Sequence, residues 1–510
     1  MFLYEDYIIN RMLNTIFEIG SYAMLKNILS KYNMASEYVK ASLWFMLCMF
    51  LQKGISTITT PIFTRILSTD EYGQFSVFNS WMSIVTVFVT LSIFHGVFTS
   101  GLVRFENNRD SFASSMQGLL LTMMLGWSLI YYLFQDFWNS ILSMTTMDMI
   151  AMFMLIWTSS IFNLWGAKQR VLLNYKRLVA ITIVVSFCTP ILGIFMVIHA
   201  DDKVMARIAS MVIVNMLAYV WLFFADLKSG RKFFSAQYWH YAIIMAVPLI
   251  PHYLSAVILG TADRIMIADI ISESAAGIYS LGYAIAQIMT IFNTSLLQSI
   301  EPWIYKKIKD DDIASLENVA YFAFLLIALL NIFFIAFAPE IVALFAPAAY
   351  YDAIWIIPPV AMSVYFTFLY GFFGCFEFYF RKTYFISLAT VIGAGLNIFL
   401  NYIFLEPVGY YAAGYTTLLC YMIFAITHYM FMNKICMDNM SGLRPYRDRK
   451  ILQISLLFII VCLVLLCTYK YLILRYIIIF LLTILIYIKR CYLQKEIGNL
   501  ANIRKNRVAG

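Results

Sequence analysis

Lys53 is the most unusual chemical group in the sequence, because it lies near the middle of an apolar run at 41–63. If that run crosses a bilayer, an ammonium group near its centre costs at least ~2.5–3.5 kcal/mol, which favours a functional role. Thr57, Thr60 and Thr64 follow on the same helical face. This face could meet water and bind an anion. The alternative is a structural lysine that is paired with a neighbouring residue.

Three further apolar runs carry polar residues at helical spacing. They are Asn79, Ser83, Thr86 and Thr90 in the second run, His252 and Ser255 after Pro248 and Pro251 in the seventh, and Gln287, Thr290, Thr294, Gln298 and Glu301 in the eighth. The two prolines predict a kink. Any single stripe could be packing, since Ser and Thr often bond their own backbone in membrane helices. Four stripes at corresponding places predict a water-filled cavity shared by the first, second, seventh and eighth runs.

We therefore predict a set of cavity residues and a set of ion-coupling residues. The cavity residues are Lys53, Thr57, Thr60, Asn79, Ser83, His252, Arg264, Gln287 and Thr294. The ion-coupling candidates are Asp263, Glu301 and Glu377. Each has a structural alternative. Arg264 could extend to the membrane surface while pairing with Asp263, and neighbours could satisfy the carboxylates.

Composition places these residues in a membrane protein. Of the 510 residues, 62% are hydrophobic and 13% are charged, and the mean hydropathy is +0.79. A soluble domain carries roughly 25% charged residues, so this chain cannot cover itself with polar surface and needs lipid as its solvent. No metal-ligand spacing, disulfide framework, P-loop or HExxH motif occurs. We expect no metal, no cofactor and no catalytic residue.

Fourteen apolar runs of roughly 20 residues are long enough to cross a bilayer as helices. They lie at 41–63, 75–100, 113–134, 148–167, 178–199, 205–225, 241–268, 276–299, 318–338, 354–378, 383–404, 410–432, 451–469 and 472–489. If the N-terminus is cytoplasmic, 29 of the 36 Lys and Arg residues fall in cytoplasmic segments. Five fall in outside turns, namely Arg65, Lys203, Arg207, Lys470 and Arg475. This asymmetry predicts that both termini are cytoplasmic. It also accounts for the net charge of +8, so nucleic acid is not an expected partner.

An internal repeat divides the chain. TPIFTRILSTDEYGQFS at Thr60–Ser76 and TADRIMIADIISESAAGIYS at Thr261–Ser280 share an Arg before apolar residues, an acidic turn, a Gly and an aromatic residue before Ser. Six runs separate the two copies, which predicts two six-helix lobes arranged as parallel repeats. The predicted fold class is an all-α polytopic membrane protein with two pseudo-symmetric lobes and two accessory C-terminal helices.

This division predicts seven parts. They are an N-terminal extension at 1–40, a lobe at 41–225, a cytoplasmic linker at 226–240, a second lobe at 241–432, a cytoplasmic loop at 433–450, peripheral lipid-facing helices at 451–489 and a basic cytoplasmic tail at 490–510. The extension is either a helix lying in the membrane interface or a stretch upstream of a true start at Met34.

Two segments resemble a known family. KASLWFMLCMFLQKGISTITTPIFTRILSTDEYGQFSVFNSW at Lys40–Trp81 resembles the start of the bacterial O-antigen and polysaccharide flippases. The second repeat copy and the EPWIYKKI that follows the eighth run are similar to the counterparts of the family's second lobe. That family belongs to the superfamily of multidrug extruders and lipid II flippases, and the resemblance covers roughly 34–450.

The resemblance implies a non-enzymatic flippase of the bacterial inner membrane. It would move an undecaprenyl-diphosphate-linked oligosaccharide, an O-antigen or capsular repeat unit, from the cytoplasmic to the periplasmic leaflet by ion-driven alternating access. Lys53 and Arg264 would then meet the diphosphate, and the polar stripes would meet the sugar. The implied partners are the lipid-linked oligosaccharide, membrane lipids, a polysaccharide polymerase and a chain-length regulator.

Two other functions remain open at this point. A multidrug antiporter of the same superfamily would favour acidic cavity residues for cationic drugs, whereas the charge at mid-membrane here is Lys53. A membrane glycosyltransferase or polysaccharide polymerase would need a large external loop with paired carboxylates. The predicted outside loops are too short for that.

Overall fold

The computed structural model describes residues 36–310, 314–382, 384–440 and 445–490, together with Met34 and Asp312. The predicted N-terminal extension and basic tail lie outside this part of the chain, apart from Met34, residues 36–40 and Arg490. Within the described residues the secondary structure is helical throughout.

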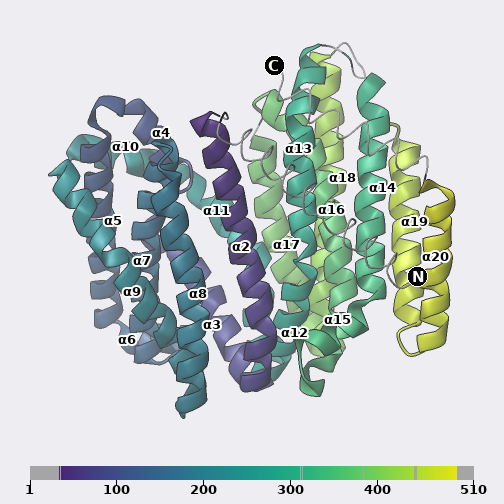
Figure 1. The fold of residues 1–510 in the computed structure, drawn as a ribbon, viewed down its shortest axis with the longest axis horizontal. Helices are drawn as coiled ribbons and strands as arrows, with labels where there is room; N and C mark the ends of the chain where they lie inside the picture. Colours follow the sequence, from purple (N-terminus) through teal and green to yellow (C-terminus); the bar gives the residue numbers. More distant parts are fainter. Residues whose placement is uncertain are drawn as a thin grey trace, which may run out of the picture.

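Two bundles of helices stand side by side, with a helical pair at one edge (Figure 1). The first bundle, the N-lobe, contains α2 (Glu37–Ile66), α3 (Thr69–Thr90), α4 (Val97–Arg104), α5 (Arg109–Leu133), α6 (Gln135–Leu142), α7 (Thr146–Val171), α8 (Tyr175–His199) and α9 (Lys203–Gly230). The second, the C-lobe, contains α11 (Ile250–Ile270), α12 (Glu273–Ala286), α13 (Met289–Lys309), α14 (Ala314–Ala336), α15 (Ala338–Phe345), α16 (Ile357–Tyr379), α17 (Tyr384–Val408) and α18 (Tyr411–Asn439). α10 (Ala236–Ala246) precedes α11 in the chain but packs on α4 and α5 of the N-lobe (Figure 1). The edge pair is α19 (Asp448–Cys467) and α20 (Leu472–Ile488).

The lobes repeat the same helix pairings. α2 packs on α8 as α11 packs on α17, and α7 packs on α9 as α16 packs on α18. Eleven helices in the described residues are long and apolar enough to cross a membrane. α20 is apolar but shorter, and α2 and α3 are long but carry the polar stripes. The predicted fold class, a polytopic helical protein with two pseudo-symmetric lobes and two further helices, is confirmed.

The two ends of the bundle differ in charge. At the end that we call the basic end, residues 104–109, 171–175, 230–236 and 306–310 connect the helices. At the opposite end, called the distal end, the connections are 66–69, 142–146, 199–203 and 270–273. The four basic-end connections hold seven Lys and Arg residues, whereas these four hold one, Lys203. Two of these distal turns begin helices with capping boxes, in which Ser68 pairs with Glu71 and Thr145 with Asp148. Asp202 and Ser272 cap the helices that follow the other two turns. These local signals explain why the chain turns sharply there.

Two predicted runs are interrupted helices. The seventh consists of α10, a 3-10 turn at Val247–Leu249 and α11, which confirms the kink expected from Pro248 and Pro251. The second run, predicted as a continuous helix at 75–100, ends instead at Thr90. Leu91 and Ser92 adopt left-handed backbone angles, φ 51° and 50°. Two such residues in succession cannot continue a right-handed helix, and α4 begins only at Val97.

The edge pair packs against the outside of the C-lobe, α19 on α14 and α16, and α20 on α14. Arg475, predicted to lie in the turn between the two helices, lies inside α20 and is 2% exposed. Its guanidinium forms an ion pair with Glu340 of α15. A buried guanidinium needs an anionic partner, so this ion pair ties a largely lipid-facing helix to the distal end of the C-lobe.

Candidate functional site

The two repeat copies meet each other at the distal end, where α3 crosses α12 (Figure 1). A Cβ atom on Gly73 would lie 1.9 Å from the carbonyl oxygen of Glu273, and one on Gly277 would lie 2.1 Å from that of Thr69. Thr69 stands four residues before Gly73 on α3, and Glu273 stands four residues before Gly277 on α12. Each glycine therefore contacts the residue one turn before the other glycine, so the contact is reciprocal. Only glycine lets the two backbones approach this closely.

Hydrogen bonds reinforce this junction, which we call the glycine crossing. Ser274 donates to the Thr69 hydroxyl at 2.7 Å, and Gln74 donates to the Glu273 carboxylate at 2.5 Å. Beside the crossing, the first repeat copy contacts the segment 344–350. Thr64 donates to the Phe345 carbonyl at 2.7 Å, Arg65 to the Leu344 carbonyl at 3.0 Å, and Tyr350 to the Ser68 carbonyl at 2.9 Å. The lobes are therefore firmly joined at the distal end.

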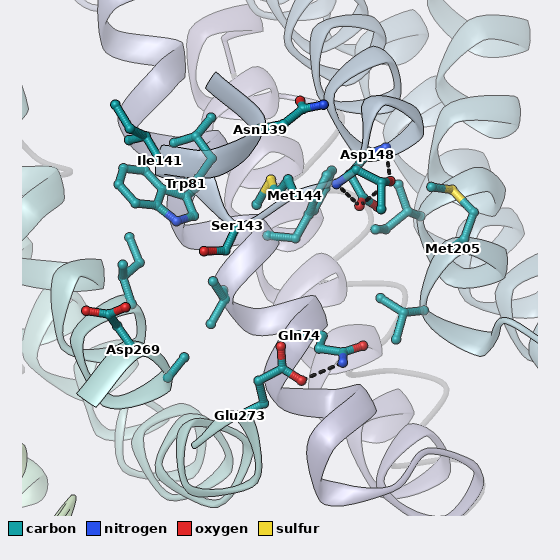
Figure 2. A pocket seen from close by; sticks show the side chains of 18 of the residues that line it. Gln74, Trp81, Asn139, Ile141, Ser143, Met144, Asp148, Met205, Asp269 and Glu273 are labelled. Carbon is teal, nitrogen blue, oxygen red and sulfur yellow. Dashed lines mark hydrogen bonds between the residues drawn. The ribbon is translucent and has the colours of Figure 1, made fainter. Parts of the chain in front are cut away.

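A cavity of about 800 Å³ lies beside the crossing at the distal end. Figure 2 shows Gln74 and Glu273 at one side, Asp269 at another and Asp148 across the space. Its lining residues include Asp202 as well, and none of them is basic. This distal cavity is acidic and would repel an anion.

A second cavity, of about 490 Å³, is shared by the two lobes in the half nearer the basic end. We call it the inter-lobe cavity. Its walls are α3, the 91–96 turn, α7 and the start of α11. Its polar lining residues are Ser83, Thr86, Ser92, His95, Ser159, Ser160, Asn163 and Tyr253. The Tyr253 hydroxyl donates to the His95 carbonyl at 3.0 Å, and the two rings lie 5.4 Å apart. Hydroxyls, an amide and an aromatic ring thus converge on one space.

Sequence patterns predicted one polar residue that lines the inter-lobe cavity and missed others. Ser83 was predicted as a cavity residue. Ser159, Ser160 and Asn163 of α7 were not, although their spacing within the run at 148–167 resembles the other stripes. The signal that could have found them is a polar face in the fourth run. Asn79 lies one turn from Ser83 and donates its amide to the Phe75 carbonyl at 2.7 Å.

The hydroxyl stripes use their protons within their own helices. Thr57 donates to the Lys53 carbonyl, Thr60 to Ser56, Ser83 to Asn79, Thr86 to Met82 and Thr294 to Thr290, all at 2.6–2.9 Å. This is the packing alternative raised by the sequence. Each hydroxyl oxygen keeps acceptor capacity, so a ligand with many donors could still bind here.

Lys53 lies on α2 with an exposed side chain. No residue of α2 lines the inter-lobe cavity or the distal cavity. Thr57 and Thr60 are half-buried, and Thr64 is buried at the distal end. The Lys53 ammonium group is therefore exposed on α2 and lies outside both the inter-lobe cavity and the distal cavity.

Asp263 and Arg264 are adjacent in the sequence, but their side chains make different contacts. Asp263 is 1% exposed, and its carboxylate accepts from Tyr279 at 2.5 Å, Asn401 at 2.7 Å and Thr417 at 2.9 Å. Arg264 donates to the Gly260 carbonyl at 2.7 Å and lies over the Tyr283 ring at 4.4 Å. Asp263 is thus satisfied by neutral donors of the C-lobe, and the pairing with Arg264 raised by the sequence is not the arrangement observed.

The remaining predicted residues belong to the C-lobe. Gln287 lies at the break between α12 and α13, and Thr294 is exposed. His252 and Glu301 line a third cavity inside this lobe. Glu377 is buried beside it. Within the described residues, no group of three or more His, Cys, Asp or Glu side chains could hold a metal ion.

Comparison with known proteins decides the family. The family described as polysaccharide biosynthesis protein matches residues 38–307, more than half of the chain. The chain belongs to this family. A relative from Haemophilus influenzae, the Lsg locus protein 1, is 23% identical over 320 residues, which cover 56% of this chain and 71% of the relative.

Two solved structures share the fold. A lipid II flippase, MurJ, in an inward closed conformation superposes with a TM-score of 0.64 at 15% identity, over 88% of this chain and 99% of that one. An inward-facing multidrug resistance transporter of the MATE family gives 0.59 at 12% identity, over 76% and 96%. At these identities the likeness shows the architecture alone. The chain is a multi-pass membrane protein with a transporter fold.

Proposed function

We propose that this protein is a flippase that moves an undecaprenyl-diphosphate-linked oligosaccharide from the cytoplasmic to the periplasmic leaflet of the bacterial inner membrane. One observation carries the proposal: a hydroxyl-rich cavity is shared by both lobes and lies above a closed distal junction. A sugar presents many hydroxyl donors, and the stripe oxygens that have used their own protons can accept them. The family supports a role in polysaccharide biosynthesis.

The basic end would face the cytoplasm, as the distribution of Lys and Arg predicts. The sugar would enter the inter-lobe cavity from that side. Lys53, exposed on α2, would meet the diphosphate near the lipid tail, which stays in the bilayer. Release on the other side requires the glycine crossing to separate, because both lobes contribute to it. The acidic distal cavity would then disfavour retention of the diphosphate.

The test uses a matched pair of threonines. Thr86 lines the inter-lobe cavity, and Thr483 lies on peripheral α20. Each donates to the carbonyl four residues earlier, at 2.6 and 2.8 Å. In a strain that lacks the native gene, Thr86→Leu should lower surface polysaccharide and accumulate the lipid-linked unit. Thr483→Leu should restore display.

Three results would count against this function. Equal display by the two variants at equal abundance would remove the inter-lobe cavity from the mechanism. Normal display after gene deletion, combined with new sensitivity to cationic drugs, would favour the multidrug exporter. Loss of polymer with normal appearance of single repeat units outside would favour a polymerase.

A further inference from the structure

The C-lobe encloses a cavity of about 510 Å³ that is distinct from the inter-lobe cavity. Its histidine and glutamate side chains come from three different helices: His252 from α11, Glu301 from α13 and His428 from α18. Most of the remaining lining is aromatic or aliphatic. We call this space the C-lobe cavity. Two histidines and a glutamate around one cavity are a costly arrangement, which favours a function over incidental packing.

Behind His428 lies a buried carboxylate. The His428 ring nitrogen Nδ1 and the Glu377 oxygen Oε1 are 2.7 Å apart, and the side chains are 3% and 0% exposed. The second oxygen, Oε2 of Glu377, has no hydrogen-bond partner among the described residues. An unpaired carboxylate oxygen in the bundle interior is destabilising. A proton on Oε2, or a water molecule donating to it, would relieve this cost.

Another side chain of the C-lobe cavity also leaves a polar atom unpaired. The Nδ1 atom of His252 is buried without a partner in the described part of the chain. Glu301 accepts from the Tyr305 hydroxyl at 2.6 Å. No Lys or Arg lines the cavity. The space therefore suits a cation and excludes a phosphate.

Several helices contribute titratable side chains around His428. They are His252 from α11, Glu301 and Tyr305 from α13, Tyr370, Cys375 and Glu377 from α16, and Tyr421 from α18 itself, while α17 contributes Thr390 and no titratable group to the cavity. The His428 ring lies 5.3 Å from that of Tyr370. Imidazole and carboxylate together are the pair best suited to hold and pass a proton near neutral pH.

The C-lobe cavity lies near the basic end. Glu377 stands two residues before the end of α16, and Ile386 and Thr390 of the lining lie in the first two turns of α17. His252 of α11 lies deeper, because α10 precedes α11 in the same span. Asp263 is eleven residues further along α11, roughly 16 Å away at the helical rise. The Asp263 cluster and the His428–Glu377 pair are therefore separate. Asp263 is surrounded by oxygen and amide donors, whereas the pair contains an imidazole and an orphan carboxylate oxygen.

We propose that His428 and Glu377 form a proton-binding site, which exchanges protons with the basic side through the C-lobe cavity. Binding adds one proton from water to the pair, and release returns it to water, so no other reactant is required. The inference deepens the proposed function, because a proton bound here would drive the conformational cycle of the transporter.

The test measures proton binding directly, without transport. Full-length protein in lipid nanodiscs is titrated while infrared spectroscopy follows the protonated-carboxyl band. The wild type should show a titrating band that Glu377→Gln removes. His428→Gln should shift its midpoint by about one pH unit or more, a tenfold change in proton affinity. Glu340→Gln is the matched control, because the Glu340 carboxylate also keeps an Oε2 without a hydrogen-bond partner among the described residues but is paired with the guanidinium of Arg475 instead of an imidazole; this variant should keep the band.

Clear results would overturn the proposal. A titrating band that survives Glu377→Gln excludes Glu377 as the proton acceptor. If Glu377→Gln folds poorly, the His428→Gln variant alone tests the proposal. An unchanged midpoint of the carboxyl band in that variant would show that His428 is not part of the proton-binding site. A midpoint that moves when sodium replaces choline would identify a metal-cation site instead. The proposed function is tested separately, and normal polysaccharide display after gene deletion would contradict it. That result would not change the outcome of the titration.

Discussion

The two lobes repeat one helix arrangement, yet they bury charge in different ways. In the N-lobe, the Lys168 ammonium lies 2.7 Å from Asp110 and 3.0 Å from Asp226, and Gln117 donates to the second oxygen of Asp226 at 3.1 Å. Every charge in this cluster has a partner of opposite sign. In the C-lobe, Asp263 is held by neutral donors, and Glu377 keeps an unpaired oxygen.

This difference separates structural charge from candidate functional charge. A closed cluster such as that of Lys168 holds α5, α7 and α9 together and leaves nothing for a ligand. An incompletely paired carboxylate beside a cavity can bind and release a cation. At the glycine crossing the two lobes contribute equally, with one glycine from each. Four predictions follow this comparison, in order of their expected effect on stability.

Asp226→Ala should destabilise the protein most. The variant leaves the buried Lys168 with only the partly exposed Asp110, and removal of one partner from a buried ion pair costs about 3–5 kcal/mol. Thermal unfolding in detergent and membrane abundance should both drop. The double variant Lys168→Met/Asp226→Leu, which replaces both charges with apolar side chains, should be more stable than Asp226→Ala. An unchanged melting temperature for Asp226→Ala would show that the N-lobe cluster is not structural.

Gly73→Ala and Gly277→Ala should weaken the distal junction by similar amounts. Each adds a methyl group where a backbone oxygen lies 1.9 or 2.1 Å away, and overpacking of this kind costs about 1–3 kcal/mol. Cysteine labelling from the distal side should rise in both variants. Gly54→Ala and Gly260→Ala are the controls, since no atom lies within 4 Å of their new methyl groups. Unequal effects of the two crossing variants would break the equivalence of the lobes.

Asp263→Asn should cost less stability, below about 1.5 kcal/mol, because the side chain keeps its shape and loses one charge-assisted hydrogen bond. If Asp263 couples an ion to transport, surface polysaccharide should nevertheless fall roughly tenfold or more. Immunoblotting of membranes supplies the abundance. Parallel loss of display and abundance would return Asp263 to a purely structural role.

Lys53→Met should have the smallest effect on stability, because the side chain is exposed. It should abolish polysaccharide display if the ammonium group meets the diphosphate. Lys53→Arg should retain part of the function, since charge matters more than shape for a loosely held phosphate. Flow cytometry with a polysaccharide antibody measures display. Normal display by Lys53→Met would refute the assignment.

The sequence by itself determined the helical membrane class and the two-lobe repeat. These follow from hydropathy and from local signals such as Ser68 with Glu71 or Pro248 with Pro251, which act within one helix or turn. It did not reveal the interruption of the second run at Leu91 and Ser92. No glycine or proline marks those two positions, so residue type alone carried no warning.

Only the tertiary structure decided which polar groups meet. Asp263 takes two of its three hydrogen bonds from residues 138 and 154 positions away along the chain, and Glu377 contacts a histidine 51 positions away. Helical spacing shows which face of a helix is polar, but the partner across that face depends on how distant helices pack. For the same reason the repeat could be read from the sequence, whereas the reciprocal contact of Gly73 and Gly277 could not.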